Sequence, residues 1–270
     1  MDLLQAIILG LVQAVTEWLP LSSKTMDTIL YKDFFGGSPE SVLSVLLFLH
    51  FGTLAAATLY FRREVIAVIK EAFAAFPNPK RHAEGKLGFI VAALFFTGLV
   101  GGPILLIESF LLPTLDGSGL LSVMGAGLIL TGFLLTSQNR HKWRTAATVG
   151  WMDGVHTGAL QGLSALPGVS RAGTSTTALI WRGFDAESAF HLSFLLSIPT
   201  VFAMEVVIWL FQGGVSAIPI AEGAMLAASS FAFGYATIEV LIRAAHRLNV
   251  AYLAFVFGML MLVFGLWGIG

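Results

Sequence analysis

Long apolar stretches divide this chain of 270 residues, and they limit the folds open to it more than any other feature. About 20 mostly apolar residues in a row are enough to cross the ~30 Å hydrocarbon core of a bilayer. Only 11% of the residues are charged, so a water-soluble globule would lack the polar side chains to cover its surface. We therefore expect an all-α polytopic membrane protein with six transmembrane helices, at residues 40–61, 87–107, 119–136, 185–211, 220–242 and 250–270.

The composition also excludes several classes of function. The formal net charge is −1, which argues against a nucleic-acid binder. The chain has no cysteine, which excludes disulfides, thiol nucleophiles and thiolate metal sites. No basic segment precedes the first apolar stretch, so we expect no cleavable signal peptide.

Two further apolar stretches, residues 3–33 and 149–181, are each interrupted by polar residues and a central proline. Non-helical backbone at membrane depth persists only where it is buried in protein or lines a water-filled cavity. We therefore predict that each stretch forms a re-entrant helical hairpin. The two interrupted tips should then meet at a site.

Lysines and arginines give the orientation, because short basic loops stay in the cytoplasm. Six of them fall in residues 62–86 and three in residues 140–144, whereas residues 108–118 and 212–219 contain none. This distribution predicts that both termini lie outside. It also predicts that the first hairpin enters the membrane from outside and the second from inside.

The sequence also contains a repeat. Three polar residues of the first hairpin have counterparts 148 positions later, where Gln13, Ser22 and Ser23 align with Gln161, Ser170 and Arg171. One hairpin and three spans make an odd number of crossings, so the two copies would be inverted. We expect one integral membrane domain over residues 1–270, with inverted repeats at 1–139 and 140–270 and a site near the midplane.

Two charged residues fall at the predicted tips. Glu17 lies in an otherwise apolar hairpin, and an acid inside the membrane is by default a functional candidate because its burial is costly. Arg171 lies at the equivalent tip, and its guanidinium presents a fork of donors that matches phosphate or carboxylate. The alternatives are an acid at the water interface and a purely structural buried pair between the two.

Residues 167–175, Pro-Gly-Val-Ser-Arg-Ala-Gly-Thr-Ser, indicate a phosphate cradle. Glycine lets backbone N–H groups approach an anion, hydroxyl groups add donors, and the following helix presents its N-terminus. The first hairpin has a matching Pro-Leu-Ser-Ser-Lys at residues 20–24. Either Ser22 or Ser23 is a nucleophile activated by a nearby base, or each serves only as a helix cap.

The remaining polar residues of the apolar stretches give weaker signals. His50, His156 and His191 lack metal-ligand spacing, and we interpret them as packing residues. Glu205 and Glu239 lie within predicted spans, and nothing in the sequence places them near the tips.

These residues resemble the motifs of the undecaprenyl pyrophosphate phosphatase family, and the resemblance covers nearly the whole chain. The first family motif has an acid or Gln, three residues, Glu and a Pro-x-Ser-Ser turn, and the chain has Gln-Ala-Val-Thr-Glu-Trp-Leu-Pro-Leu-Ser-Ser at residues 13–23. The second motif, Pro-Gly-x-Ser-Arg-Ser-x-x-Thr, corresponds to residues 167–175. The family fold of six transmembrane helices and two inverted re-entrant hairpins agrees with the one expected from the charge counts.

The resemblance implies hydrolysis of undecaprenyl or another polyprenyl diphosphate to the monophosphate and inorganic phosphate, which recycles the lipid carrier of cell-envelope glycan synthesis at the plasma membrane. It implies catalytic roles for Glu17 as base or magnesium ligand, Ser23 as nucleophile and Arg171 as phosphate ligand. The other candidate substrate-binding residues are Gln13, Ser22, Lys24, Gln161, Gly168, Ser170 and Thr174.

The resemblance also bears on cofactors and partners. Mg²⁺ or another divalent cation is compatible with the site through Glu17, and no organic cofactor is expected. The expected partners are the polyprenyl diphosphate and the surrounding membrane lipids, but no nucleic acid. A homodimer is left open.

The chain departs from the family pattern in one respect that concerns chemistry. Where the family has Thr-Gly-His after the serine pair, residues 24–26 are Lys-Thr-Met, so the imidazole best suited to proton transfer is absent. Together with Gln13 in place of the commoner Glu, Met26 resembles a divergent, archaeal-type branch. The alternative function is a flippase or transporter for polyprenyl phosphate with little or no hydrolysis, because inverted repeats with interrupted helices are transporter architecture.

Overall fold

A computed structural model describes residues 1–75, 85–111, 115–138, 143–212, 217–245 and 250–268. Within these ranges the chain forms helices and one isolated β-bridge, between Arg144 and Phe184, and contains no strand. The expected all-α class is confirmed.

The helices fall into two sets, one for each half of the chain. In chain order, the first half contains α1 (Leu3–Trp18), α2 (Ser23–Ile29), α3 (Pro39–Tyr60), α4 (Arg62–Ala75), α5 (Gly85–Leu111) and α6 (Gly117–Thr136). The second half contains α7 (Trp151–Gln161), α8 (Arg171–Trp181), α9 (Ala186–Gln212), α10 (Ile220–Ala245) and α11 (Val250–Leu266). Single π or 3-10 turns follow α2 and α7 and precede α7.

Five of the described helices are long and apolar enough to cross a membrane, which makes this an integral membrane protein. They are α3, α5, α6, most of α9 and most of α10. The sixth expected span corresponds to α11, which is apolar but has 17 residues and ends at Leu266 rather than at residue 270. The last two residues of that predicted span lie outside the described part of the chain.

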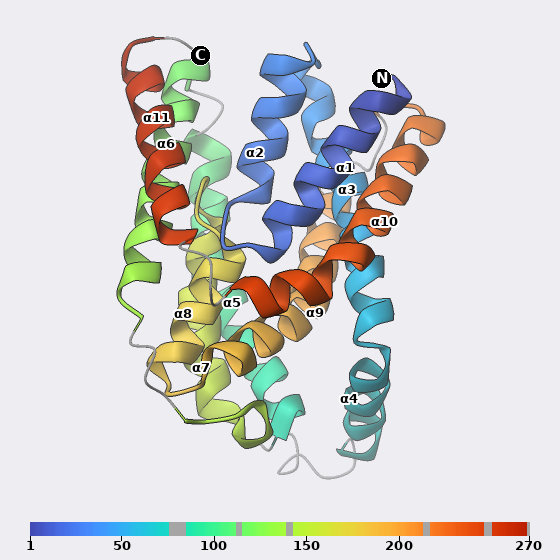
Figure 1. Ribbon diagram of the computed structural model, residues 1–270, viewed down its shortest axis with the longest axis vertical. Helices are drawn as coiled ribbons and strands as arrows, with labels where there is room; N and C mark the ends of the chain where they lie inside the picture. The colour runs from blue at the N-terminus through green and yellow to red at the C-terminus, as the bar shows by residue number, and fades with distance from the viewer. Residues whose placement is uncertain (76–84, 112–114, 139–142, 213–216, 246–249, 269–270) are drawn as a thin grey trace.

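The two interrupted stretches enter the molecule from opposite ends. Figure 1 shows α1 descending from the N-terminus to the middle and α2 returning upward, whereas α7 starts near the lower end, the end at which α4 also lies. The helix α11 ends at the same end of the molecule at which α1 begins. The two turns, between α1 and α2 and before α8, therefore lie near mid-height.

Packing between the halves is reciprocal. The first helix of each interrupted stretch lies along a long helix of the other half, α1 along α10 and α7 along α5. The approach of α7 to α5 requires glycine, because a Cβ added at Gly154 would lie 2.3 Å from the carbonyl oxygen of Phe89. One turn later, a Cβ at Gly158 would lie 2.3 Å from that of Ala93. Small residues four apart allow such close contact between helices in membranes.

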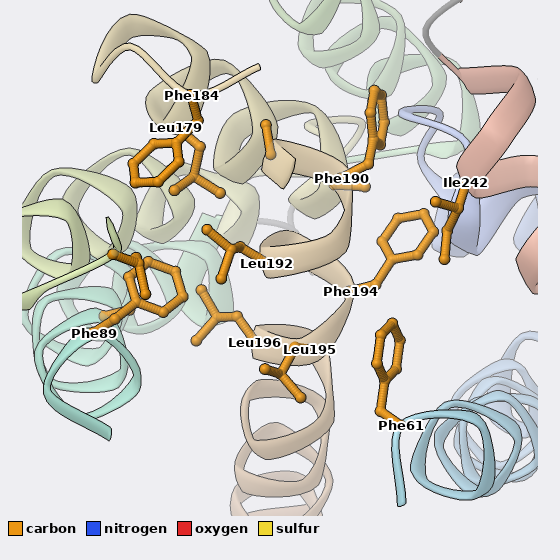
Figure 2. Close-up of a cluster of buried hydrophobic side chains, with 14 of the residues drawn as sticks. Phe61, Phe89, Leu179, Phe184, Phe190, Leu192, Phe194, Leu195, Leu196 and Ile242 are labelled. Carbon is orange, nitrogen blue, oxygen red and sulfur yellow. The ribbon is translucent and has the colours of Figure 1, made fainter. Parts of the chain in front are cut away.

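The largest apolar core is built around α9. Figure 2 shows Leu192, Phe194 and Leu195 projecting from this helix toward side chains of α3, α5 and α10, and all three are buried. The ring of Phe194 packs 5.3 Å from that of Trp18, the last residue of α1. Trp18 also donates from Nε1 to the carbonyl oxygen of Gly234 on α10. These contacts fix the end of α1, and with it the adjacent Glu17.

Candidate active site at the two helix interruptions

The structure brings together the three residues predicted to be catalytic. Ser23 donates its hydroxyl hydrogen to Oε2 of Glu17 over 2.8 Å, and Nη2 of Arg171 donates to the other oxygen, Oε1, over 2.5 Å. Glu17 is only 9% exposed and Ser23 only 6%. An acid, a hydroxyl group and a guanidinium from α1, α2 and α8 therefore form one buried cluster, although Glu17 and Arg171 are 154 positions apart in the chain.

The turn between α1 and α2 explains why Ser23 and not Ser22 reaches the acid. Leu19 leaves α1 in an extended conformation, and α2 restarts at Ser23, so Ser22 occupies the N-cap position. Ser22 makes no side-chain capping bond, and its Oγ accepts from Thr25 instead. The pure capping interpretation therefore does not fit Ser23, whose hydroxyl group points to the carboxylate.

The second turn is held more tightly. Gly168 has a φ of +83°, and a Cβ at this position would lie 2.0 Å from the carbonyl oxygen of Met124 on α6. Ser170 caps α8 by accepting from the backbone N–H of Gly173, and its own N–H donates to Thr131. Thr174 donates back to carbonyl oxygens of the first turn of α8. The predicted cradle is thus a capped helix N-terminus directly beside Arg171.

The two predicted glutamines occupy equivalent but separate positions. Gln13 and Gln161 are fully buried, and their Nε2 groups donate to Thr53 and Thr200 respectively, which are themselves 147 positions apart. Within the described residues, neither amide oxygen has a hydrogen-bond partner. Neither glutamine hydrogen-bonds to the cluster of Glu17, Ser23 and Arg171 there, so the structure does not bring these two into the cluster.

Lys24, the remaining predicted ligand, is half-buried on α2 next to Ser23. Among the described residues it forms no ion pair. Its ammonium group is therefore available to an anion that approaches the first turn.

Sequence reasoning did not place two further residues at this cluster, His50 beside Glu17 and Glu205 beside His50. His50 on α3 is 4% exposed, and its Nε2 lies 3.8 Å from Oε2 of Glu17. Its Nδ1 lies 3.8 Å from Oε1 of Glu205 on α9. The packing interpretation of His50 therefore has to be corrected, since the ring lies between two carboxyl groups.

A third carboxyl group also escaped the sequence analysis. Asp27 lies on α2 one helical turn after Ser23, is fully buried, and has no hydrogen-bond partner for either oxygen within the described residues. Its position four residues after Ser23 was a signal, because residues four apart share one face of a helix.

The site does not by itself fit a metal ion. Both oxygens of Glu17 are engaged by Ser23 and Arg171. The described part of the chain contains no group of three His, Asp or Glu side chains placed to hold a metal. We therefore derive no chemical step through magnesium.

Fold and site together define an integral membrane protein whose polar centre combines a serine, a carboxylate and an arginine at two helix interruptions. The profile of the family described as bacitracin resistance protein BacA matches residues 6–267. The chain belongs to this family, and by that membership it is a membrane phosphatase, a class of hydrolase.

Curated relatives extend over almost the same length. A protein named undecaprenyl-diphosphatase from Methanococcoides burtonii is 35% identical over 96% of this chain and 97% of its own. Proteins of the same name from Haloarcula marismortui and Sulfurisphaera tokodaii are 36% and 31% identical, and they cover 98% and 96% of this chain and 97% and 95% of their own. These relatives are archaeal, in agreement with the branch that the first motif resembles.

Proposed function

We propose that the chain hydrolyses undecaprenyl or a related polyprenyl diphosphate to the monophosphate and inorganic phosphate, and so recycles the lipid carrier of cell-envelope glycan synthesis at the plasma membrane. The observation that carries this proposal is the shared carboxylate of Glu17, which binds a serine hydroxyl group on one oxygen and an arginine on the other. A nucleophile within hydrogen-bond reach of its base is the signature of covalent catalysis.

These contacts support the following mechanism of hydrolysis. Oγ of Ser23 attacks the terminal phosphorus while its proton passes to Oε2 of Glu17, which lies 2.8 Å from Oγ. The bond from phosphorus to the bridging oxygen breaks, and the lipid monophosphate leaves with that electron pair. Water then hydrolyses the phosphoserine, releasing inorganic phosphate, and the proton of Glu17 returns to Ser23.

Arg171 neutralises charge on the reacting phosphoryl group. Charge on the transferring oxygens is stabilised by fixed cations, and this supplies most of the catalysis of phosphoryl transfer. Nη1 of Arg171 also donates to the carbonyl oxygen of Ser193, and this bond fixes the guanidinium plane. Ser170, Thr174 and Gly168 would place the N-terminus of α8 behind the same phosphate, with Lys24 on the opposite side.

We also propose that the chain folds as two inverted repeats around a pair of re-entrant hairpins. Two inverted repeats, residues 1–139 and 140–270, would each contribute one re-entrant hairpin. The reciprocal packing of α1 on α10 and of α7 on α5 supports this arrangement, as do the equivalent bonds of Gln13 to Thr53 and of Gln161 to Thr200. The diphosphate would lie between the tips while the isoprenoid tail leaves sideways between apolar helices.

Phosphate release from a long-chain prenyl diphosphate by the protein purified in detergent tests the proposal. We expect Glu17→Gln, Ser23→Ala and Arg171→Ala each to lower the rate about 100-fold or more. Wild-type release no greater than that of Arg171→Ala would refute hydrolysis. If Ser23→Ala keeps full activity while Glu17→Gln is inactive, the nucleophile is a water molecule activated by Glu17 and not Ser23. Because the described residues form no metal site, we expect equal rates with Mg²⁺ and with a chelator, and loss of activity with the chelator would contradict this mechanism.

A polyprenyl-phosphate transporter is the second candidate. The reciprocal packing of the two halves favours it, because paired interrupted helices near the midplane are typical of transporters. In liposomes, a transporter would move the lipid phosphate across the bilayer at equal rates in wild type and Ser23→Ala.

A further inference from the structure

We propose that His50 supplies to Glu17 the imidazole that the chain lacks at position 26, and that it acts as a positioning residue for this base. The inference rests on the proposed hydrolysis. Position 26 is Met, and it lies on α2 three residues after Ser23, on the same side of the helix. His50 comes instead from α3, and its ring reaches the same carboxylate from another direction.

The backbone determines which ring nitrogen faces Glu17 with a lone pair. Nδ1 lies 2.7 Å from the carbonyl oxygen of Leu46. A carbonyl oxygen only accepts, so Nδ1 carries the hydrogen and donates. In the neutral ring Nε2 is then an acceptor. It lies 3.8 Å from Oε2 of Glu17, the oxygen that also accepts a hydrogen bond from the hydroxyl group of Ser23.

This geometry suits the state that follows attack. Once Ser23 has given its proton to Oε2, that oxygen becomes a donor, and Nε2 of His50 is an acceptor for it. Distances of this kind are often long in the unliganded state and shorten in the reacting complex. The hydrogen bond would stabilise neutral Glu17 when Arg171, which is bound to the other oxygen, turns to the phosphoryl group.

Glu205 completes the arrangement. Its Oε1 lies 3.8 Å from Nδ1 of His50, and neither of its oxygens has a hydrogen-bond partner among the described residues. Because Nδ1 already donates its hydrogen to the carbonyl oxygen of Leu46, Glu205 acts on the ring through its electrostatic field and not through a hydrogen bond. The other charged groups that act on the His50 ring are Lys24 of α2 and Arg171 of α8.

The repeat argues against a packing role common to both halves. The position 147 residues after His50 is Ser197 of α9, whose hydroxyl group donates to the carbonyl oxygen of Phe194. The glutamine and threonine pairs recur in both halves, but at this repeat position an imidazole is present in the first half and a serine in the second. We therefore assign the His50 ring a role beside Glu17 and not a packing role.

The test compares kcat and KM for phosphate release in four variants of the purified protein. We expect His50→Leu to lower kcat about 100-fold with KM within about twofold, because the phosphate ligands are untouched. The double variant His50→Leu with Met26→His should recover most of that loss, since it restores an imidazole one turn from Ser23. Glu205→Gln should lower kcat about 10-fold, again with little change in KM.

His156→Leu is the matched control. Its Nδ1 makes the same 2.7 Å bond to the carbonyl oxygen four residues earlier, that of Met152, but the side chain is exposed. Its kcat should equal that of wild type. If His50→Leu does not fold, as judged by gel filtration and thermal unfolding, His50→Gln takes its place in the same comparison.

Two results would overturn the inference. One is wild-type kcat in the His50 variant while Arg171→Ala is inactive, and the other is a loss that Met26→His leaves unchanged. Failure of the proposed function is distinguishable, because wild type itself would then release no more phosphate than Arg171→Ala.

Discussion

The turn between α1 and α2 differs from the turn before α8 in what holds it in place. In the first turn, Ser22 sits at the N-cap without a capping bond, and α2 has only 7 residues before a π turn. In the second, Gly168 is wedged against α6, Ser170 caps α8, and α8 has 11 residues. The second turn is therefore held by a close backbone contact and a cap, whereas the first is held by the bond of Ser23 to Glu17 and leaves the carboxyl group of Asp27 without a partner among the described residues.

A second difference lies where the interrupted stretches begin. The stretch of α7 and α8 is tied by Asp153, which accepts two hydrogen bonds from Arg144 at 2.8 Å and one from Arg182 at 2.9 Å. Arg144 also stacks on the ring of Phe184. The first stretch begins with a capping box between Asp2 and Gln5 and has no such ion cluster in the described structure. The start of the second stretch is thus held by two arginines on one carboxylate, whereas the start of the first is held by its capping box and by the ion pair of the N-terminus with Glu222.

The largest expected effect concerns the guanidinium of Arg171, beside the second turn. Arg171→Lys keeps the charge but cannot bind Glu17 and phosphate in the same plane, so we expect kcat to fall about 100-fold. Lys24→Arg, on the first turn, should change it less than about threefold, because the ammonium group there acts as a point charge. Equal losses of kcat in the two variants, measured by phosphate release, would contradict the proposed difference between the two turns.

The next effect tests the wedge at the second turn. Gly168→Ala combines a positive φ with a 2.0 Å contact to Met124, and we expect a loss of stability of about 3 kcal/mol or more. Gly36→Ala is the matched control, with a φ of +67° but no atom within 4 Å of the added Cβ, and should lose about 1 kcal/mol. Thermal unfolding in detergent measures both, and similar losses would show that the wedge contributes nothing.

A smaller effect is expected at the ion cluster. Asp153→Asn removes the carboxylate from Arg144 and Arg182 and should lower stability by about 2 kcal/mol. Asp116→Asn is the control, because Asp116 caps α6 through Gly119 and Asn caps a helix equally well. If the two variants unfold at the same temperature, the second stretch is not tied by this cluster.

The smallest effect separates the two N-caps. Ser170→Ala removes the bond to Gly173 and should lower stability by about 1 kcal/mol. The double variant Ser22→Ala with Thr25→Val removes no capping bond and takes away both partners of the Thr25–Ser22 hydrogen bond, so it should leave the free energy of unfolding within about 0.5 kcal/mol of wild type. Equal destabilisation would mean that the first turn is capped after all.

The meeting of Glu17 with Arg171 was predictable because charges are so few in this chain. Two ions at the tips of the two repeated hairpins have almost no other partners, and the structure pairs them directly. The span boundaries were also accessible, since long apolar runs end where polar caps begin. The first residues of α3, α9 and α10 lie close to the expected ones.

The approach of His50 to Glu205 was not predictable from the sequence. The helices α3 and α9 are apolar around most of their circumference, so no polar face indicates which side points inward. Only the packing of α9 against α3 brings the two side chains together. The residues alone left the choice between Ser22 and Ser23 open for a similar reason, because it depends on the residue at which α2 restarts.

The pairing of Glu17 with Arg171 has a consequence for how the chain is made. The ribosome synthesises the acid 154 residues before its counter-charge, and α10, on which α1 packs, is made later still. Until the second half has been inserted, Glu17 lacks its counter-charge, and α1 lacks the long helix along which it packs. The unit of assembly is therefore the complete chain, and a product truncated before α8 would present membrane quality control with an unpaired acid.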